Sequence, residues 1–112
     1  MWFKNQYHED LYNCLLAKAQ VTRDCEYCSA LYVLAATGKT NVVSFVQRRE
    51  IDFDGLKKAM KAWSHSEKGL VKLAATLFNS TVHSAKVDDV FQWLDEKNVR
   101  VAINALQIRY AR

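Results

Sequence analysis

The chain has 112 residues, of which half are hydrophobic and a quarter are charged, and this composition excludes a disordered or fibrous protein. No apolar run approaches the roughly 20 residues that a membrane-spanning helix needs, and the start of the chain lacks a signal-peptide pattern, so we expect a soluble, cytoplasmic protein. Proline is absent and glycine occurs three times, which favours long helices. We therefore predict one all-α domain over residues 1–112, a compact bundle of five to six helices. The net charge of +4 permits an acidic partner such as nucleic acid without requiring one.

Two helices are predicted at the start of the chain, over residues 4–19 and residues 24–37. In the first, apolar side chains recur every four residues, as on one face of an α-helix: Tyr7, Leu11, Leu15 and Ala19. Gly38 follows the second, where a helix commonly ends in the left-handed conformation. Residues 42–46 fit both a helical turn and a strand, so their structure is left open.

Two further helices are predicted in the middle of the chain, over residues 54–63 and residues 67–79. Asp54 is the expected N-cap of the first of them, because its carboxylate can accept from the exposed N–H groups of a first turn. Ser64 or Ser66 is the expected N-cap of the second for the same reason.

The end of the chain is predicted to hold a loop, a short helix and a long last helix. The loop covers residues 79–86 and contains His83, the short helix begins near Val87, and the last helix covers residues 97–110. The last helix carries two apolar stripes: Val99, Ala102, Ile103, Leu106 and Tyr110 on one, and Val101, Ala105 and Ile108 on the other. So wide an apolar arc predicts a helix at the centre of the bundle.

The three tryptophans are expected in two kinds of environment. Trp63 and Trp93 fall on apolar stripes and are predicted in the core. Trp2 lies near the start of the chain, where it either docks on the fold or belongs to an interface, since aromatic side chains are enriched in interfaces.

All three cysteines lie in the first two predicted helices. If these helices form an antiparallel hairpin, Cys14 and Cys28 are level with each other, roughly 7 Å from the connection, and Cys25 is one turn nearer to it. Three converging thiolates are part of the ligand set of a structural zinc ion, which needs a fourth ligand. The sequence therefore predicts a zinc site made by Cys14, Cys25 and Cys28.

The fourth zinc ligand is left open among three histidines. His8 is nearest in sequence but points away from Cys14 on a continuous helix, and His65 and His83 could reach the site only through the tertiary fold. The alternative is that Cys14 and Cys28 are small core residues and Cys25 is a surface thiol.

Five lysines define a candidate binding surface in the middle of the chain: Lys57, Lys58, Lys61, Lys68 and Lys72. If the helices over residues 54–63 and 67–79 pack side by side, these lysines form one basic surface for a partner, nucleic acid included. The alternative is an ordinary solvated helical face.

The sequence offers no set of residues from which a reaction could be named. Serines and histidines are present, but none lies in a nucleophile turn, and there is no glycine-rich phosphate loop. We therefore expect a protein that is not an enzyme.

Several segments together resemble a family of small phage and prophage proteins of Gram-positive bacteria. The cysteines lie outside these segments, which are the opening Met1, Phe3 and His8, residues 29–34, residues 70–79, and much of residues 94–110. Small phage proteins of this kind are commonly anti-defence factors that act inside the host bacterial cell.

The resemblance implies an anti-CRISPR protein that binds and inhibits a type II RNA-guided nuclease without catalysis. The basic net charge argues against a DNA mimic and favours a nuclease surface that controls the loading of target DNA. The alternative is a nucleic-acid-binding or regulatory phage protein that uses the lysine-rich face.

Overall fold

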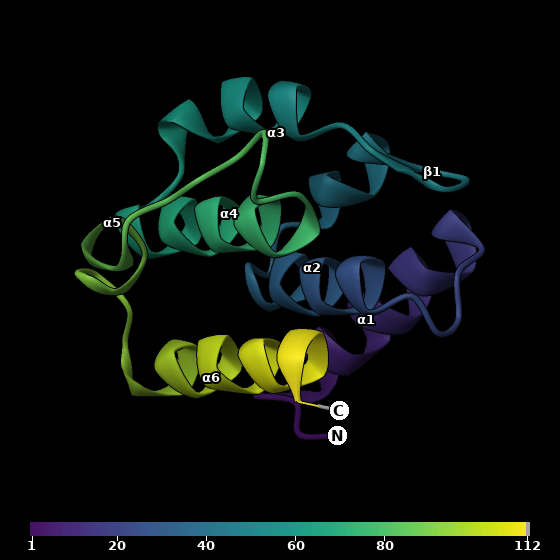
Figure 1. Cartoon of the computed structure of the whole chain (residues 1–112), viewed down its shortest axis with the longest axis horizontal. Helices are drawn as coiled ribbons and strands as arrows, with labels where there is room; N and C mark the ends of the chain where they lie inside the picture. The colour runs from purple at the N-terminus through teal and green to yellow at the C-terminus, as the bar shows by residue number, and fades with distance from the viewer. Residues whose placement is uncertain (112) are drawn as a thin grey trace.

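The computed structural model describes residues 1–111, and in this range six α-helices, two short 3-10 helices and one two-stranded hairpin follow one another. The predicted all-α class is therefore confirmed (Figure 1). In chain order the elements are α1 (Gln6–Ala19), α2 (Cys25–Ala36), η1 (Thr40–Phe45), β1 (Val46–Gln47), β2 (Glu50–Ile51), α3 (Phe53–Ala59), η2 (Met60–Ala62), α4 (His65–Phe78), α5 (Val87–Phe91) and α6 (Glu96–Tyr110). None of the helices in this range is long and apolar enough to cross a membrane.

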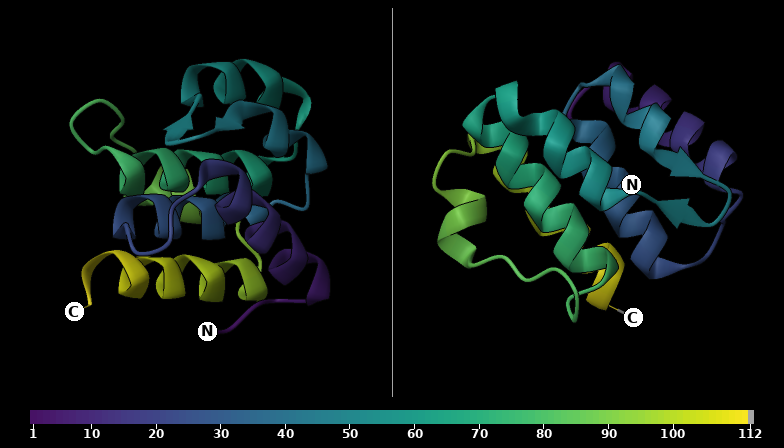
Figure 2. Two further views of the ribbon diagram at one scale, coloured as in Figure 1. Left: turned by 90° about the vertical axis from the view of Figure 1, so that its right-hand side faces the viewer. Right: turned by 90° about the horizontal axis from the view of Figure 1, so that it is seen from above.

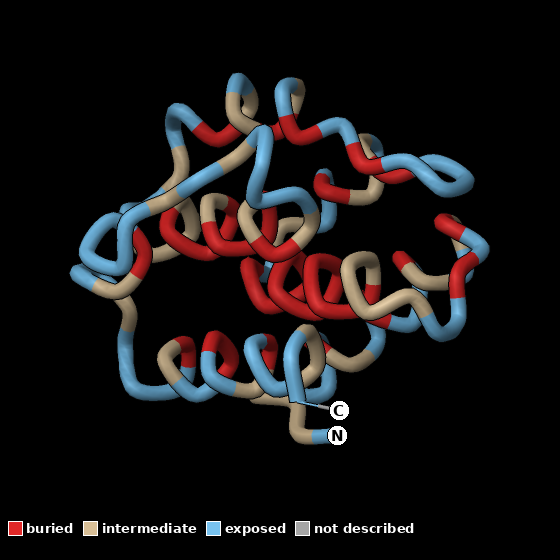
Figure 3. Tube along the Cα trace, viewed as in Figure 1, coloured by how far each residue is buried: buried red, intermediate tan, exposed pale blue. Residues whose placement is uncertain are grey.

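Helix α2 is the centre of the fold. It packs against α1, α4 and α6 (Figures 1 and 2), and every residue from Cys28 to Ala36 is buried (Figure 3). Residues 27–36 contain no charged side chain, and a helix that is hydrophobic all round is stable only when it is buried on all sides. The prediction that the last helix occupies the centre is wrong, because α2 takes that place and α6 covers only one side of it.

Five helix starts are capped by side chains that accept from backbone N–H groups, and at α6 the cap is Asp95, which accepts from Asn98 N–H. Asn5 caps α1, Asp24 caps α2, and Ser64 forms a reciprocal capping box with Glu67 at the start of α4. Of the two serines proposed for this cap, Ser64 is therefore the one that caps α4. At α3 the cap is Asp52, which accepts from Gly55 N–H.

Two predicted helix positions need correction. Asp54 is not the cap of the third helix but lies inside its first turn, because the helix begins at Phe53. Tyr7 is exposed, whereas His8 is fully buried. The buried stripe of α1 runs through His8, Leu11, Tyr12, Leu15 and Ala19. The predicted stripe omitted His8 because it was based on apolar residues alone.

The segment left open by the sequence forms a 3-10 helix and then a short antiparallel hairpin. In the hairpin, Val46 pairs with Ile51 and Gln47 pairs with Glu50. At its tip Arg49 has a positive φ of 53°, and its N–H donates to the carbonyl of Ala19 at 2.9 Å. The hairpin thus satisfies one of the carbonyl groups that the end of α1 leaves without a helical partner.

A ring cluster joins the N-terminal segment, α1 and α2. The ring of Phe3 lies 5.1 Å from that of His8 and 5.8 Å from that of Tyr32, and Tyr12 lies 6.0 Å from Tyr32 between ring centroids. These edge and tilted arrangements are the ones that aromatic rings favour. The cluster fixes the start of the chain against the central helix.

The two tryptophans predicted in the core lie nearer the surface. Trp93 is 57% exposed and stacks on His65 with 5.2 Å between ring centroids. Trp63 is partly buried, and Lys39 Nζ lies 5.7 Å from its ring centroid. For Trp93 the core prediction is wrong, because α5 ends at Phe91 and Trp93 lies in the exposed turn that follows the helix.

Candidate functional site

A pocket of about 220 Å³ lies between α3, α4 and the loop that follows α4. We call it the α3–α4 pocket. Its lining combines cationic, hydroxyl and apolar side chains with one carboxylate: Lys57, Met60, Lys72, Thr76, His83, Ser84, Ala85 and Asp89. The loop is held in place because Ala85 N–H donates to the hydroxyl of Thr76 at 3.1 Å.

His83 and Lys57 interact directly at this pocket. The nitrogens Lys57 Nζ and His83 Nδ1 are 3.0 Å apart, and because an ammonium group can only donate, Nδ1 accepts. Burial, and then the positive charge of Lys57, lower the pKa of His83. The ring is therefore neutral near pH 7, carries its proton on Nε2, and packs against Phe53.

The structure brings together two of the five predicted partner-binding lysines. Lys57 of α3 and Lys72 of α4 line the same pocket, as expected from helices that lie side by side. Lys58 and Lys61 are exposed outside the pocket, and Lys68 is partly exposed. The binding role of all five remains a prediction.

The three cysteines have different environments. Cys14 is exposed, Cys25 is partly exposed and Cys28 is buried. On α1, Cys14 is turned about 100° from the buried Leu15, away from the face that packs on α2. Among residues 1–111 no group of three histidine, cysteine or acidic side chains could hold a metal ion, so the geometry gives the zinc prediction no support, and it remains a prediction.

Cys28 behaves as a packed core thiol. Burial raises the pKa of this thiol, which opposes the thiolate that zinc binds. Its Sγ donates to the carbonyl of Thr22 at 3.8 Å. For Cys28, packing is the simpler interpretation.

Each histidine proposed as a fourth ligand is engaged elsewhere. His8 Nε2 lies 2.8 Å from the carbonyl of Tyr32, and its Nδ1 accepts from Lys4 N–H at 3.2 Å. His65 stacks on Trp93, and His83 accepts from Lys57.

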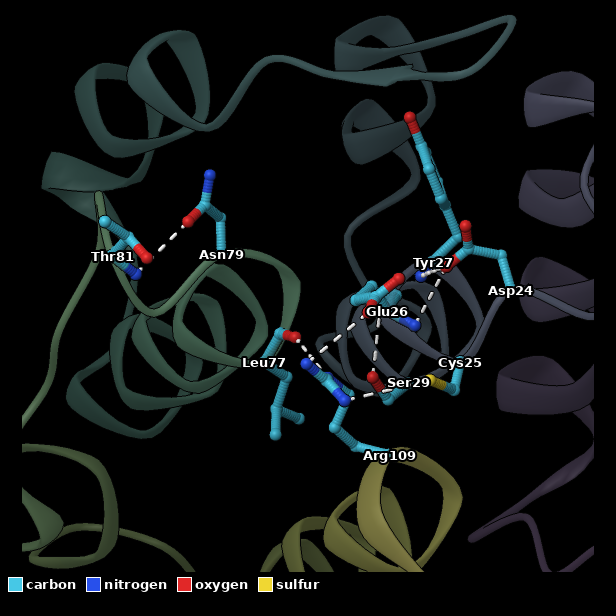
Figure 4. A network of polar contacts seen from close by, with 9 residues as sticks. All are labelled: Asp24, Cys25, Glu26, Tyr27, Ser29, Leu77, Asn79, Thr81 and Arg109. Atoms are coloured by element: carbon cyan, nitrogen blue, oxygen red, sulfur yellow. Dashed lines mark hydrogen bonds and ion pairs between the residues drawn. The ribbon is translucent and has the colours of Figure 1, made fainter. Parts of the chain in front are cut away.

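Arg109 makes a polar network that the sequence did not predict (Figure 4). Its Nε donates to the carbonyl of Leu77 at 3.0 Å, Nη1 donates to Cys25 Sγ at 3.7 Å, and Nη2 lies 3.5 Å from a carboxylate oxygen of Glu26. One side chain thus links α6, α4 and α2. The sequence signal was a basic residue in the last turn of an amphipathic helix, which is too common to single out.

Helix α6 leaves an apolar face uncovered, which we call the α6 outer face. Its members are spaced four, three and four residues apart, so they form one narrow stripe: Val99, Ile103, Leu106 and Tyr110. Ile103, Leu106 and Tyr110 are 50%, 39% and 56% exposed. Of the predicted apolar stripe, Ala102 is fully buried, whereas Ile103, Leu106 and Tyr110 stay exposed.

Trp2 forms one edge of the α6 outer face. Its carbonyl accepts from the hydroxyl of Tyr32 at 2.6 Å, and the guanidinium of Arg100 lies 4.2 Å from its ring centroid. An open groove of about 730 Å³ runs beside it, with Lys4, Lys97 and Ile103 in its lining. Of the two alternatives for Trp2, docking on the fold is confirmed.

Over residues 1–111 the fold is a small helical one that presents a basic pocket between α3 and α4 and an uncovered apolar face on α6. The chain belongs to a family of unknown function, DUF6075, which it matches over residues 1–112. No protein of curated function and no solved structure matches it.

Proposed function

We propose that this protein acts by binding a macromolecular partner, without catalysis, through the α6 outer face. The observation that carries the proposal is the stripe of exposed apolar side chains on α6. Apolar side chains aligned at helical spacing are the anchors by which a helix enters a hydrophobic groove on a protein. Nucleic acid would instead require a predominantly cationic face.

The charges around the stripe define the partner surface further. Lys4, Lys97 and Arg100 line the groove beside Trp2, and Glu96 is the one acid in that lining. Complementary charges guide association and select the partner. The expected partner surface is an apolar groove with an acidic rim.

The partner that we propose is a type II RNA-guided nuclease in a bacterial cell. The resemblance to small phage proteins supports this choice. The protein would occupy a nuclease surface that controls target-DNA loading, and would block cleavage by occupancy alone.

Capture and cleavage assays with one purified type II nuclease, loaded with guide RNA, test this proposal. The protein is expected to bind the nuclease and to reduce cleavage of target DNA. Ile103→Glu should weaken both effects at least about tenfold, because a charge replaces an apolar anchor. Val82→Glu is the matched control, since Val82 is 70% exposed but lies in the loop after α4. Absence of binding together with undiminished cleavage would reject the nuclease as partner.

A second candidate function, nucleic-acid binding, is favoured by the convergence of Lys57 and Lys72 on one pocket. Duplex and single-stranded DNA should then bind with an affinity that falls steeply as salt rises. The double variant Lys57→Glu, Lys61→Glu should lose this binding. Lys97→Glu on α6 is the control for altered charge, and equal effects of both variants would contradict a specific lysine surface.

A further inference from the structure

We infer that the α3–α4 pocket is a binding site for a small phosphate monoester, formed by Lys57, Lys72, His83 and Ser84. The inference goes beyond the proposed function, because the pocket and the α6 outer face are built from different residues.

The lining of the pocket carries more positive than negative charge. In residues 1–111 the ion pairs are Lys39–Glu67 and Arg109–Glu26, so neither Lys57 nor Lys72 is paired with a carboxylate. Asp89 is the one acid in the lining of the pocket. Two ammonium groups against one carboxylate leave the pocket cationic, and it attracts an anion.

His83 and Ser84 add two further donors to the lining of the pocket. Because Nδ1 of His83 accepts from Lys57, the ring carries its proton on Nε2, which is an N–H donor. Ser84 adds a hydroxyl to the lining. Two ammonium groups, an imidazole N–H and a hydroxyl match the several oxygens of a phosphoryl group.

The size and polarity of the pocket fit a small phosphate monoester. The volume of about 220 Å³ is below the range of about 300–1,000 Å³ that is typical of drug-sized ligands. Met60 and Ala85 supply apolar wall for a small organic group. A monoester carries close to two negative charges at neutral pH, which two lysines can balance, whereas a phosphodiester carries one.

The charged groups that face His83 come from three helices: Lys57 and Asp54 of α3, Lys72 of α4 and Asp89 of α5. A bound dianion would outweigh the effect of Lys57 and raise the pKa of His83. This titration gives a direct signal of occupancy.

The test follows the His83 imidazole resonances of the full chain by NMR during titration with inorganic phosphate, AMP and cyclic AMP. AMP is expected to bind at one site and to raise the pKa of His83, with inorganic phosphate weaker. Cyclic AMP, a diester with the same nucleoside, is expected to bind at least about tenfold more weakly than AMP. Binding of inorganic phosphate but not AMP, or equal binding of AMP and cyclic AMP, would overturn the inference.

Three variants localise the site. Lys72→Gln should weaken AMP binding about tenfold, whereas Lys58→Gln, which changes the charge outside the pocket, should leave it unchanged. Asp89→Asn should strengthen binding about threefold, since it removes the one carboxylate in the lining of the pocket. This gain cannot result from misfolding. No response of His83 up to about 10 mM AMP, or equal effects of the two lysine variants, would refute the site.

Discussion

The side chain of Arg109 donates a hydrogen bond of 3.0 Å from Nε to the main-chain carbonyl of Leu77. Leu77 lies in the last turn of α4, where carbonyl groups have no partner within the helix. A side chain of α6 thus caps the C-terminal end of α4, although the two residues are 32 positions apart in the chain. The nearby ion pair with Glu26 is partly exposed and adds little, because solvent screens such pairs.

Arg109→Lys tests this cap. Lysine keeps the charge but lacks the planar set of donors that reaches Leu77 and Cys25 together. The variant is expected to lower the free energy of unfolding by about 1 kcal/mol, measured by urea denaturation. Arg23→Lys at an exposed site is the control, and equal stability of the two variants would show that the cap contributes nothing.

Gly69→Ala tests the close approach of α4 to α5. A Cβ atom at Gly69 would lie 2.6 Å from the carbonyl oxygen of Val90, so a backbone has to move. We expect a loss of about 1–3 kcal/mol in the free energy of unfolding, although alanine is the better helix former. Ser66→Ala in the same helix is the control. If Gly69→Ala were as stable as the original chain, α5 would be able to shift at no cost.

The stability of the protein is expected to fall in acid through His8. Burial, followed by the positive charge of the nearby Lys4, lowers the pKa of His8 below the ordinary histidine value of 6.5. The folded state therefore binds the proton more weakly than the unfolded state, so its stability is complete above about pH 6.5 and declines as pH falls below that value. A proton on Nδ1 would also face the N–H of Lys4 and break their hydrogen bond.

Urea denaturation between pH 7.5 and pH 5 measures this effect. His8→Gln lowers stability at pH 7.5, because a ring in the aromatic cluster is lost, but it should reduce the pH dependence below 6.5. An unchanged pH dependence in His8→Gln would assign the acid sensitivity to other groups.

The cysteines give a prediction that separates packing from zinc binding. From their burial, Cys14→Ser should leave the melting temperature unchanged, whereas Cys28→Ser should lower the free energy of unfolding by about 1–3 kcal/mol, because a buried hydroxyl replaces a thiol. The zinc prediction requires about one zinc per chain by elemental analysis, with loss of metal and stability in both variants. If the original chain holds zinc and the Cys14→Ser variant is both metal-free and destabilised, the result would support zinc binding over simple packing.

The sequence predicted the helices well because their signals are local. Caps such as Ser64 and the glycine at position 38, which has a φ of 71°, depend on a few neighbouring residues, as does the spacing of apolar side chains. The absence of charge between residues 27 and 36 was a local signal too. This signal indicates that α2 is the central helix. The wide apolar arc of α6 led instead to the prediction that α6 is central.

What the sequence could not predict depends on contacts between distant elements. It identified Lys57 and Lys72 as partner-binding candidates, yet their meeting with His83 depends on the path of the loop after α4. Apolar periodicity shows that a face is hydrophobic but not that another element covers it, so the exposure of Ile103 was missed. The network of Arg109 was not predicted for the same reason, because its partners lie on two other helices.

The contact between Arg49 and Ala19 couples two parts of the chain in their opening motions. Because the hairpin tip satisfies a carbonyl of α1, the hairpin cannot detach without leaving that carbonyl unpaired. Local opening events in proteins expose backbone amides to hydrogen exchange as cooperative units. Hydrogen exchange of the amides of Arg49 and of the last turn of α1 should therefore report a common free energy of opening, as expected for one unit assembled from segments about 30 residues apart.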